Sequence, residues 1–289
     1  MKPGTTNHRP FLLAALVVLG TAASAAVQTR HQEFSLSKEK ELEVILDISF
    51  GNVTLERCDG NSAATVDYSE DDRDHQRYSV SYDVSGETGT LRIKLKEPSH
   101  FWEGGEHAGH KHHLDIGISA NIPVSFDIEL GAGKGDFDLT DLQVKDFKIS
   151  TGASSVNMEC GQPNPIAAED VSIESGVSKF SASGLGNLNF HHLKFSGGVG
   201  SYKLDFDGKF HQSASAEIEV GLGSITVYVP KTLPTRLSYD DNWLSSFSLD
   251  DDFDKKSNSE YETEDFREAS KRFTIRLDSG LGSVKVYRK

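Results

Sequence analysis

The stretch GLGSITV at residues 221–227 and the nearly identical GLGSVKV at residues 280–286 decide the fold of this chain. In both, a Gly-Leu-Gly-Ser turn leads into an alternating segment. Related turns occur at four other places, which are GKGDFDL (133–139), GASSVNM (152–158), GVSKFSA (176–182) and GVGSYKL (198–204). The first glycines of the first five turns recur with a period of about 22 residues, which predicts a solenoid whose units cover one another's apolar faces. A single longer step then separates the turns at 221 and 280.

Side chains alternate between apolar and polar on both sides of each turn. In FDIELG, which leads into the first of these turns, Ile128 and Leu130 fall on one face, and Asp127 and Glu129 fall on the other. This period of two indicates strands with one buried face. The glycines then lie at corners, where the chain turns tightly or takes a positive φ. The sequence therefore predicts an all-β fold, a single β-solenoid of stacked coils of about 22 residues.

The segment GAGKGD at 131–136 is superficially similar to a phosphate-binding loop. Such loops need a following helix, whose N-terminus faces the phosphate. Here the next residues, FDLTDLQVKDFKI, alternate as a strand does, and the same corner recurs along the chain. The pattern favours a solenoid corner over nucleotide binding.

The long step between the last two turns contains a polar, acidic insertion at 241–270, which we expect to cover the open end of the solenoid. The predicted organisation is a signal peptide (1–25), an N-terminal β segment with the first coils (26–98), a His-rich loop (99–117) and the repeat solenoid (118–289), which includes the insertion.

The N-terminus has the features of a secretory signal peptide. Lys2 and Arg9 precede a short apolar run at 11–20, and Ala23-Ser24-Ala25 forms a small-residue cleavage site. No second apolar run has spanning length, so we expect no transmembrane span after cleavage. These features predict an exported protein, either periplasmic or on the cell surface.

The charge balance argues against nucleic-acid partners. The whole chain has 30 basic and 44 acidic residues and a net charge of −14. Removal of residues 1–25 takes away two basic residues and makes the charge about −16. Such a chain repels nucleic acid and anionic lipid. We expect an envelope protein or a glycan as partner.

The chain has two cysteines, Cys58 and Cys160. Export would place them in an oxidising compartment, where a disulfide between them can form. Stacking in chain order, however, puts several layers between them, and a disulfide needs Cα atoms within about 7 Å. Two buried free thiols are the alternative.

The segment 99–117 is rich in histidine. Our candidate metal ligands are His107, His110, His112 and His113, with Glu106 beside them. Neutral imidazole binds Zn(II), Cu(II) or Ni(II), and a loop with glycines can gather several around one ion. The spacing fits no rigid tetrahedral site, and a solvated loop tip is the alternative.

Other motifs for chemistry are absent from the sequence. The acidic runs at 69–74 and 249–254 do not fit a calcium loop; counted from Asp250, the places for Gly and Glu hold Lys255 and Tyr261. There is no nucleophile elbow and no zinc-protease motif. The alternation predicts that four aspartates are outward-facing strand residues, namely Asp136, Asp138, Asp205 and Asp207. We therefore predict that the protein is not an enzyme.

The chain resembles the bacterial toast-rack family of secreted or membrane-tethered β-solenoid domains. The resemblance covers roughly residues 40–289 and is carried by the runs at 122–158, 184–208 and 217–239. Related domains occur in adhesin-like surface proteins and in membrane proteins linked to cell-wall stress. The resemblance implies a right-handed solenoid of uncharacterised role, with no catalytic set to transfer. The His-rich loop departs from the family pattern.

These observations favour an exported, non-enzymatic β-solenoid of the bacterial envelope, acting as an adhesin-like or structural module. An exposed aromatic or apolar patch on one lateral face would support a binding role. The first alternative is a periplasmic metal-binding protein that uses the loop at 100–113. A weaker alternative is a glycan-active enzyme of the kind found among parallel β-helices.

Overall fold

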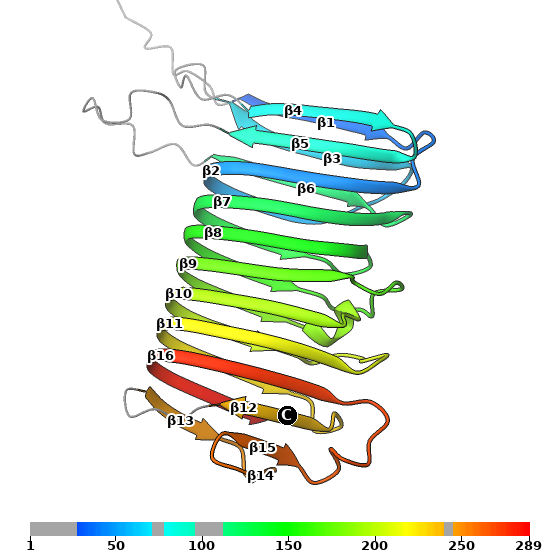
Figure 1. Ribbon diagram of the computed structural model, residues 1–289. Coiled ribbons are helices and arrows are strands. Elements are labelled where there is room, and N and C mark those ends of the chain that lie inside the picture. Colours follow the sequence, from blue (N-terminus) through cyan, green and yellow to red (C-terminus); the bar gives the residue numbers. More distant parts are fainter. Residues whose placement is uncertain (1–27, 71–77, 96–111, 240–244) are drawn as a thin grey trace, which may run out of the picture.

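The computed structural model describes residues 28–70, 78–95, 112–239 and 245–289. It shows long strands stacked one above another, with a short 3-10 turn at Leu185–Leu188 (Figure 1). Neighbouring strands in the sheet follow the order β1-β3-β6-β2-β7-β8-β9-β10-β11-β16-β12-β15-β14. The predicted all-β solenoid is confirmed.

Each central coil is one long strand that bends at its glycines. The bend divides the strand into a first arm before the corner and a second arm after it. Between β7 and β8, Phe126 pairs with Phe147 in the first arm, and Phe137 pairs with Met158 in the second. The corners form one edge of the molecule, on the left in Figure 1, and loops join the coils at the opposite edge. We call the first of these the corner edge.

The coil-forming strands are β7 (Pro123–Asp138), β8 (Gln143–Glu159), β9 (Asp170–Ser183), β10 (His192–Asp205), β11 (Ala214–Val229) and β16 (Phe273–Arg288). All of them pair in parallel with their neighbours, and their corners stay in register. Each coil therefore covers the next one along the stack, as the repeat predicts.

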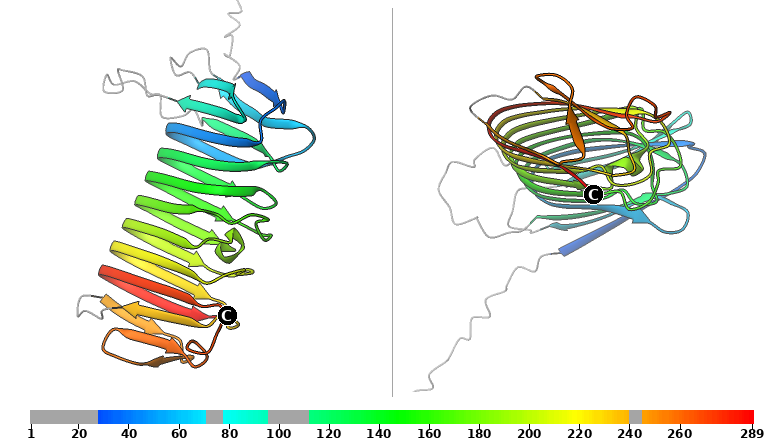
Figure 2. Two further views of the ribbon diagram at one scale, coloured as in Figure 1. Left: turned by 45° about the vertical axis from the view of Figure 1, so that its right-hand side comes forward. Right: turned by 90° about the horizontal axis from the view of Figure 1, so that it is seen from below.

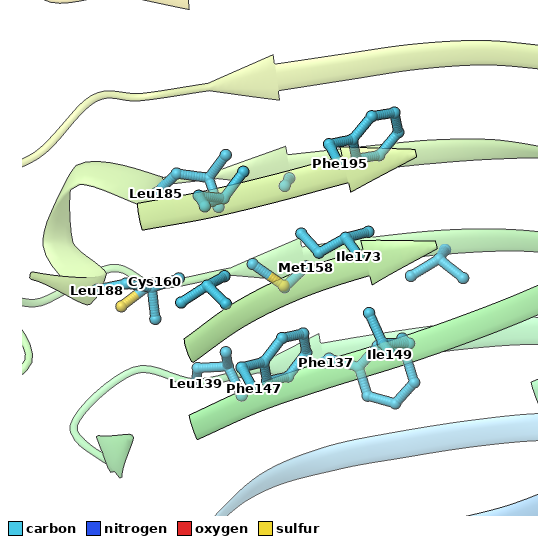
Figure 3. Packing of buried hydrophobic residues seen from close by; sticks show 14 of the residues in the cluster. Phe137, Leu139, Phe147, Ile149, Met158, Cys160, Ile173, Leu185, Leu188 and Phe195 are labelled. Atoms are coloured by element: carbon cyan, nitrogen blue, oxygen red, sulfur yellow. The ribbon is translucent and has the colours of Figure 1, made fainter. Parts of the chain in front are cut away.

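The core lies between the two arms. Ile128 and Leu130 are each 1% exposed, whereas Asp127 and Glu129 point to solvent, as the alternation predicts. Figure 3 shows Phe137, Met158 and Ile173 from successive coils packed together in this interior. Full burial of one such side chain contributes roughly 1.5–3 kcal/mol. Because every coil repeats the pattern, the core is a continuous column.

The N-terminal segment already contains coils. Strand β2 (Glu41–Cys58) pairs with β7 along both arms, and its outer side pairs with two separate strands, β5 (Thr88–Leu95) and β6 (His113–Ser119). Antiparallel strands complete this end, namely β1 (Gln28–Ser35), β3 (Ser62–Glu70) and β4 (Tyr78–Ser85). The residues from His113 onwards in the expected His-rich loop are therefore strand, while 99–111 lie outside the described residues.

The described part of the insertion, residues 245–270, lies beyond the last coil. Strand β12 (Thr235–Tyr239) and β13 (Ser245–Leu249) pair with the first and second arms of β16. The hairpin of β14 (Phe253–Lys255) and β15 (Glu260–Thr263) then extends the first-arm sheet, and these strands close the lower end in Figure 2. In space, β16 therefore lies between β11 and β12, although it follows both in the sequence.

The two cysteines are free, so the disulfide considered from the sequence is not formed. Cys58 ends β2 and Cys160 follows β8, with β7 between these strands. Two strand spacings are about 9–10 Å, which exceeds the reach of a disulfide. Burial raises the pKa of the Cys160 thiol to about 12, so it stays protonated and packs as a small apolar group.

Buried charged side chains close both ends of the stack. At the N-terminal end, the carboxylate of Glu39 accepts hydrogen bonds from the backbone of Ser37 and Lys38 and from the hydroxyl of Tyr82, which lies 2.6 Å away. At the other end, the guanidinium of Arg288 donates to three oxygens, which are the carbonyls of Leu233 and Lys231 and the hydroxyl of Thr235. Hydrogen bonds to most of their polar atoms allow these two side chains to cover an apolar column, although Nε of Arg288 has no hydrogen-bond partner among the described residues.

Candidate interaction surfaces

The corner edge carries a row of exposed aliphatic side chains, which we call the apolar ridge. Its members are Val177, Val199, Leu222 and Leu281, which are 65%, 46%, 43% and 45% exposed. Each pairs in register with the next one, across β9, β10, β11 and β16. Scattered exposed aliphatics are ordinary, whereas a row of them in register on one edge makes a candidate interaction surface.

The ridge exists because the residue at the apex of each corner has no interior to face. The chain turns outward at this point, so the side chain between the two corner residues projects into solvent. In the two coils before β9, the same place is taken by Ala132 and Ala153, whose side chains are small. The ridge is therefore confined to the C-terminal part of the corner edge.

The outer face of the second arm carries a second surface, which we call the tyrosine strip. The rings of Tyr228 and Tyr287 lie side by side, with centroids 5.7 Å apart and planes at 33°. The ammonium of Lys203 lies 5.3 Å from the centre of the Tyr228 ring. Both tyrosines are half-exposed on neighbouring strands β11 and β16. A Tyr pair on an exposed sheet face is typical of a binding surface, since it combines a large apolar ring with a polar tip.

A shallow depression of about 260 Å³ lies on the same second-arm face, nearer the N-terminus. Acidic and amide side chains line it, among them Asp136, Asp138, Asn157 and Glu159, and Ser181 and Ser183 border it on β9. The amide of Asn157 donates to Asp136 over 2.9 Å. The second-arm face thus offers hydrogen-bonding groups at one end and a pair of neighbouring aromatic rings at the other.

Of the four aspartates that the alternation predicts to face solvent, three do so and one is buried. Asp136, Asp138 and Asp207 are exposed, but Asp205 is just 8% exposed. Lys289 covers it, because its ammonium lies 2.8 Å from the Asp205 carboxylate and 3.0 Å from that of Asp207. This pairing joins the residue after β16 to the coil of β10.

The two candidate metal ligands that the structure describes, His112 and His113, differ in their surroundings. The side chain of His112 is buried, and its ring lies edge-on to Phe50 with centroids 4.8 Å apart. His113 points outward, 3.0 Å from the carboxylate of Asp115. The structure therefore does not bring this pair to one ion, while His107, His110 and Glu106 lie outside the described residues. Within the described ranges, no group of three His, Cys, Asp or Glu side chains could hold a metal ion.

Two further histidines, His191 and His192, lie next to each other and are both exposed. Strand β10 begins only at His192, whose ring nitrogen lies 3.0 Å from the hydroxyl of Ser215. The preceding residue is therefore outside the alternating strand.

The tyrosine strip was not singled out from the sequence, although a signal for it exists. In GLGSITVYV and GLGSVKVYR, tyrosine stands at the same distance from the turn. Because the corners stay in register, equal distances from the corner place the two rings on adjacent strands. Aligning the turns by their outward positions, as well as their inward ones, would have found it.

Stacked parallel coils around one continuous core define the class of this protein as a β-solenoid. The match to a family is direct, because residues 23–183 match the N-terminal domain of toast_rack, DUF2154. The chain belongs to the toast-rack family. In the described part of the chain, no helix is both long and apolar enough to cross a membrane.

Solved structures that resemble this chain have low sequence identity to it. A candidate cell adhesion protein of Clostridium sporogenes is 15% identical, with 91% of this chain and 100% of that chain covered and a TM-score of 0.48. A candidate adhesin of Bacteroides fragilis is 13% identical, with 91% and 99% covered and a TM-score of 0.38. A comparison with curated proteins gives no match.

Proposed function

We propose that this chain is an exported, non-enzymatic, adhesin-like module of the bacterial envelope that binds a glycan through its second-arm face. The observation that carries the proposal is the tyrosine strip on β11 and β16, which shares one lateral face with a polar depression on β2, β7, β8 and β9. Family membership supports the general class but supplies no ligand.

A glycan fits this surface better than an apolar ligand does. Sugar rings present C–H faces that stack on aromatic rings and hydroxyls that hydrogen-bond to carboxylates and amides. The strip supplies Tyr228 and Tyr287, and the depression supplies Asp136, Asn157 and Glu159. These groups lie on strands of one sheet face, so an extended chain of sugars can cross several strands.

The exposure of the carboxylates supports binding rather than catalysis. A glycoside hydrolase needs one carboxylic acid held in an apolar pocket, so that it can act as a general acid. Asp136, Asp138 and Glu159 are all exposed to solvent on the outer face. They are suited to accepting hydrogen bonds from sugar hydroxyls.

Export is part of the proposal and rests on the N-terminal sequence. Residues 1–25 have the basic start, apolar run and small-residue site of a signal peptide. The test is N-terminal sequencing of the protein recovered from culture medium and envelope fractions. A mature N-terminus at Ala26 is the expected result, and an intact Met1 in the cytosol would contradict export.

Binding is tested with the chain 26–289 against immobilised peptidoglycan fragments and envelope polysaccharides. We expect reversible binding that Tyr228→Ala with Tyr287→Ala abolishes, since stacking on these rings is lost. The matched control is Tyr261→Phe, which keeps in place a buried aromatic ring of the C-terminal cap, the strands β12 to β15 beyond the last coil. Equal binding by the double variant and the wild type would contradict the assignment of the strip.

A metal-binding role is the second candidate, and the arrangement around His113 favours it. His113 lies beside Asp115, and Asp115 pairs across the strands with Asp67, which lies 2.8 Å from His31. Two imidazoles and two carboxylates therefore occupy one exposed area at the N-terminal end. These described side chains do not by themselves form a metal site, so the role needs His107 and His110, which precede the area in the sequence.

Calorimetric titration with Zn(II), Cu(II) and Ni(II) tests this second candidate. The control replaces His107, His110, His112 and His113 by Ser. Stoichiometric binding that the control loses would support metal capture by the His-rich segment. Weak binding without a defined stoichiometry, unchanged in the control, would contradict it.

A further inference from the structure

The apolar ridge has neighbours with small side chains or none. The corner sequences are Gly-Val-Ser in β9, Gly-Val-Gly in β10 and Gly-Leu-Gly in both β11 and β16. Most of the exposed aliphatic side chains are therefore flanked on both sides by glycines, which have no side chain. Another protein surface can approach this backbone closely, because no large side chain stands in the way.

The ridge is also straight and regular. Its side chains sit on consecutive strands in register, so they are spaced by about 4.8 Å and extend over about 14 Å. A second row with the same spacing matches it layer by layer. The ridge of a second copy of this chain necessarily has the same spacing between its side chains.

The two flanks of the corner edge differ in charge next to the corner, because the first-arm flank is acidic and the second-arm flank carries lysine or serine. On the first-arm flank, the residues nearest the corner include Glu129, Glu174 and Asp278. On the second-arm flank, the position next to the corner holds Lys134 in β7 and Lys179 in β9, and serine in the other coils, while Lys285 lies two residues further along β16. Arg276 lies 3.4 Å from Asp278, so the β16 coil has the less acidic flank.

We propose that the apolar ridge pairs two copies of this chain side by side in parallel, about a two-fold axis that runs along the stack. Rotation about this axis places the first-arm flank of one copy against the second-arm flank of the other. Glu174 then faces Lys179 of the partner subunit, and the reciprocal pair forms by symmetry. An antiparallel pair would set first arm against first arm, with Glu129, Glu174 and Asp278 near like charges.

The ridge alone is too small for a stable dimer. Four half-exposed aliphatic side chains present at most a few hundred Å², whereas a specific interface buries roughly 800 Å² per partner. The flanks must supply the rest, and these contacts are polar. The dimer is therefore a weak one that forms at micromolar concentrations or above.

This pairing goes beyond the proposed function and leaves its surface open. The tyrosine strip lies further along the second arm than Lys179, away from the corner, so both copies still expose it. The dimer would hold two strips on opposite sides with their coils at equal heights. Two linked binding faces increase the avidity for a repeating polymer.

Analytical ultracentrifugation of the chain 26–289, between about 1 and about 100 μM, is the first arm of the test. We expect a monomer–dimer equilibrium that Leu222→Ser shifts to monomer over the whole range. Glu174→Lys and Lys179→Glu should each weaken the dimer about tenfold, because each creates two repulsive contacts. The double variant, in which the charges are exchanged, should regain the wild-type equilibrium. A monomer at all concentrations, or a double variant as weak as the single ones, would overturn the proposal.

Cross-linking of Leu281→Cys separates the two orientations. In the parallel pair this residue faces its own counterpart across the axis, so mild oxidation should give a 281–281 disulfide located by mass spectrometry. In an antiparallel pair the two would be about 14 Å apart, too far to bond. Thr226→Cys, on the second-arm face away from the axis, is the control that should stay monomeric. Circular dichroism checks that each variant is folded, and glycan binding is measured separately, so failure of pairing is distinguishable from failure of the strip.

Discussion

A side chain at the corner glycines would meet the backbone of the coil beside it. At Gly223, where φ is +126°, an added Cβ would overlap the carbonyl oxygen of Gly200, and the same happens at Gly282 against Gly223. Glycine is therefore required for two reasons. The backbone has a positive φ that other residues avoid, and the neighbouring strand lies too close to leave room for a Cβ atom. These corners fix the register on which the ridge and the strip both depend.

Comparing Gly223→Ala with Gly60→Ala separates the effect of the positive φ from the effect of the close neighbouring strand. For Gly223→Ala we expect at least about 2 kcal/mol of lost stability in urea unfolding, since both conformational strain and overlap apply. Gly60 is the matched control, because its φ is +84° but nothing lies within 4 Å of an added Cβ. Gly60→Ala should cost only about 1 kcal/mol. Equal losses in the two variants would contradict the role of close strand approach.

Glu39 provides a pH-dependent contribution at the N-terminal end. Burial alone would raise the pKa of its carboxyl group, but hydrogen bonds from Ser37, Tyr82 and the backbone outweigh burial and lower that pKa to about 2. The unfolded value is about 4.5, so the folded state binds fewer protons between pH 4.5 and 2. The stabilisation is complete above pH 4.5 and is lost as the pH falls towards 2.

Glu39→Gln tests this account. At pH 7 the variant should be less stable than the wild type by about 1–2 kcal/mol, because hydrogen bonds to a charged acceptor are replaced by neutral ones. The difference in unfolding free energy should shrink as the pH is lowered from 5 to 2. A difference that is the same at pH 7 and pH 3 would show that the carboxylate charge has no part in it.

At the scale of the elements, much of the fold was predictable because a coil repeats a local pattern. Alternation and the glycine period identified the strands, the corners and the buried column that includes Ile128 and Leu130. The order of the last strands was not predictable, since no local pattern says that β16 inserts between β11 and β12. The position of His112 was also missed, because its burial depends on Phe50 of a neighbouring coil.

The candidate surfaces were less predictable than the fold. An alternating sequence shows that a residue points outward, but it does not show which outward residues meet across strands. The tyrosine strip and the apolar ridge both depend on the register between coils, and β11 and β16 are far apart in the sequence. Of the metal ligands expected at 107–113, the structure describes only His112, which precedes β6, and His113, which begins it. The other expected ligands rest on the sequence alone.

The C-terminal cap depends on one buried cation. Arg288 is 7% exposed and donates to oxygens of Leu233, Lys231 and Thr235, and burial lowers the pKa of its guanidinium. Arg288→Met should therefore destabilise the protein by about 2–3 kcal/mol, since two carbonyls lose a charged donor. Arg57→Met is the control, because its side chain is half-exposed and pairs with the exposed Asp59. Thermal unfolding that moves equally in both variants would contradict a structural role for the cap.

At the scale of the whole molecule, the second-arm face is divided along the stack. Its N-terminal part carries Asp67, Asp115 and Asp136, and its C-terminal part carries Lys203 with Tyr228 and Tyr287. The whole chain has a net charge of −14, about −16 without residues 1–25, so it repels polyanions over long distances, and the glycan proposed for this face should not be a polyanion. Neutral polysaccharide meets this condition.

Salt should affect the two proposed interactions differently. Pairing through the corner edge depends on exposed charges, and raising the ionic strength from about 0.05 to about 0.5 M should weaken the dimer. Binding of a neutral glycan by the tyrosine strip should change little over the same range. Measuring both equilibria in the same salt series checks this. A salt-insensitive dimer would contradict the pairing of Glu174 with Lys179 of the partner subunit.

The central claim is that the second-arm face binds a glycan without altering it. The most direct measurement combines binding of the chain 26–289 to a panel of envelope polysaccharides with mass spectrometry of the glycans afterwards. The account predicts reversible binding to at least one glycan, loss of that binding in the Tyr228→Ala, Tyr287→Ala variant, and unchanged glycan masses. Release of a shortened product, or binding that survives loss of both tyrosines, would contradict it.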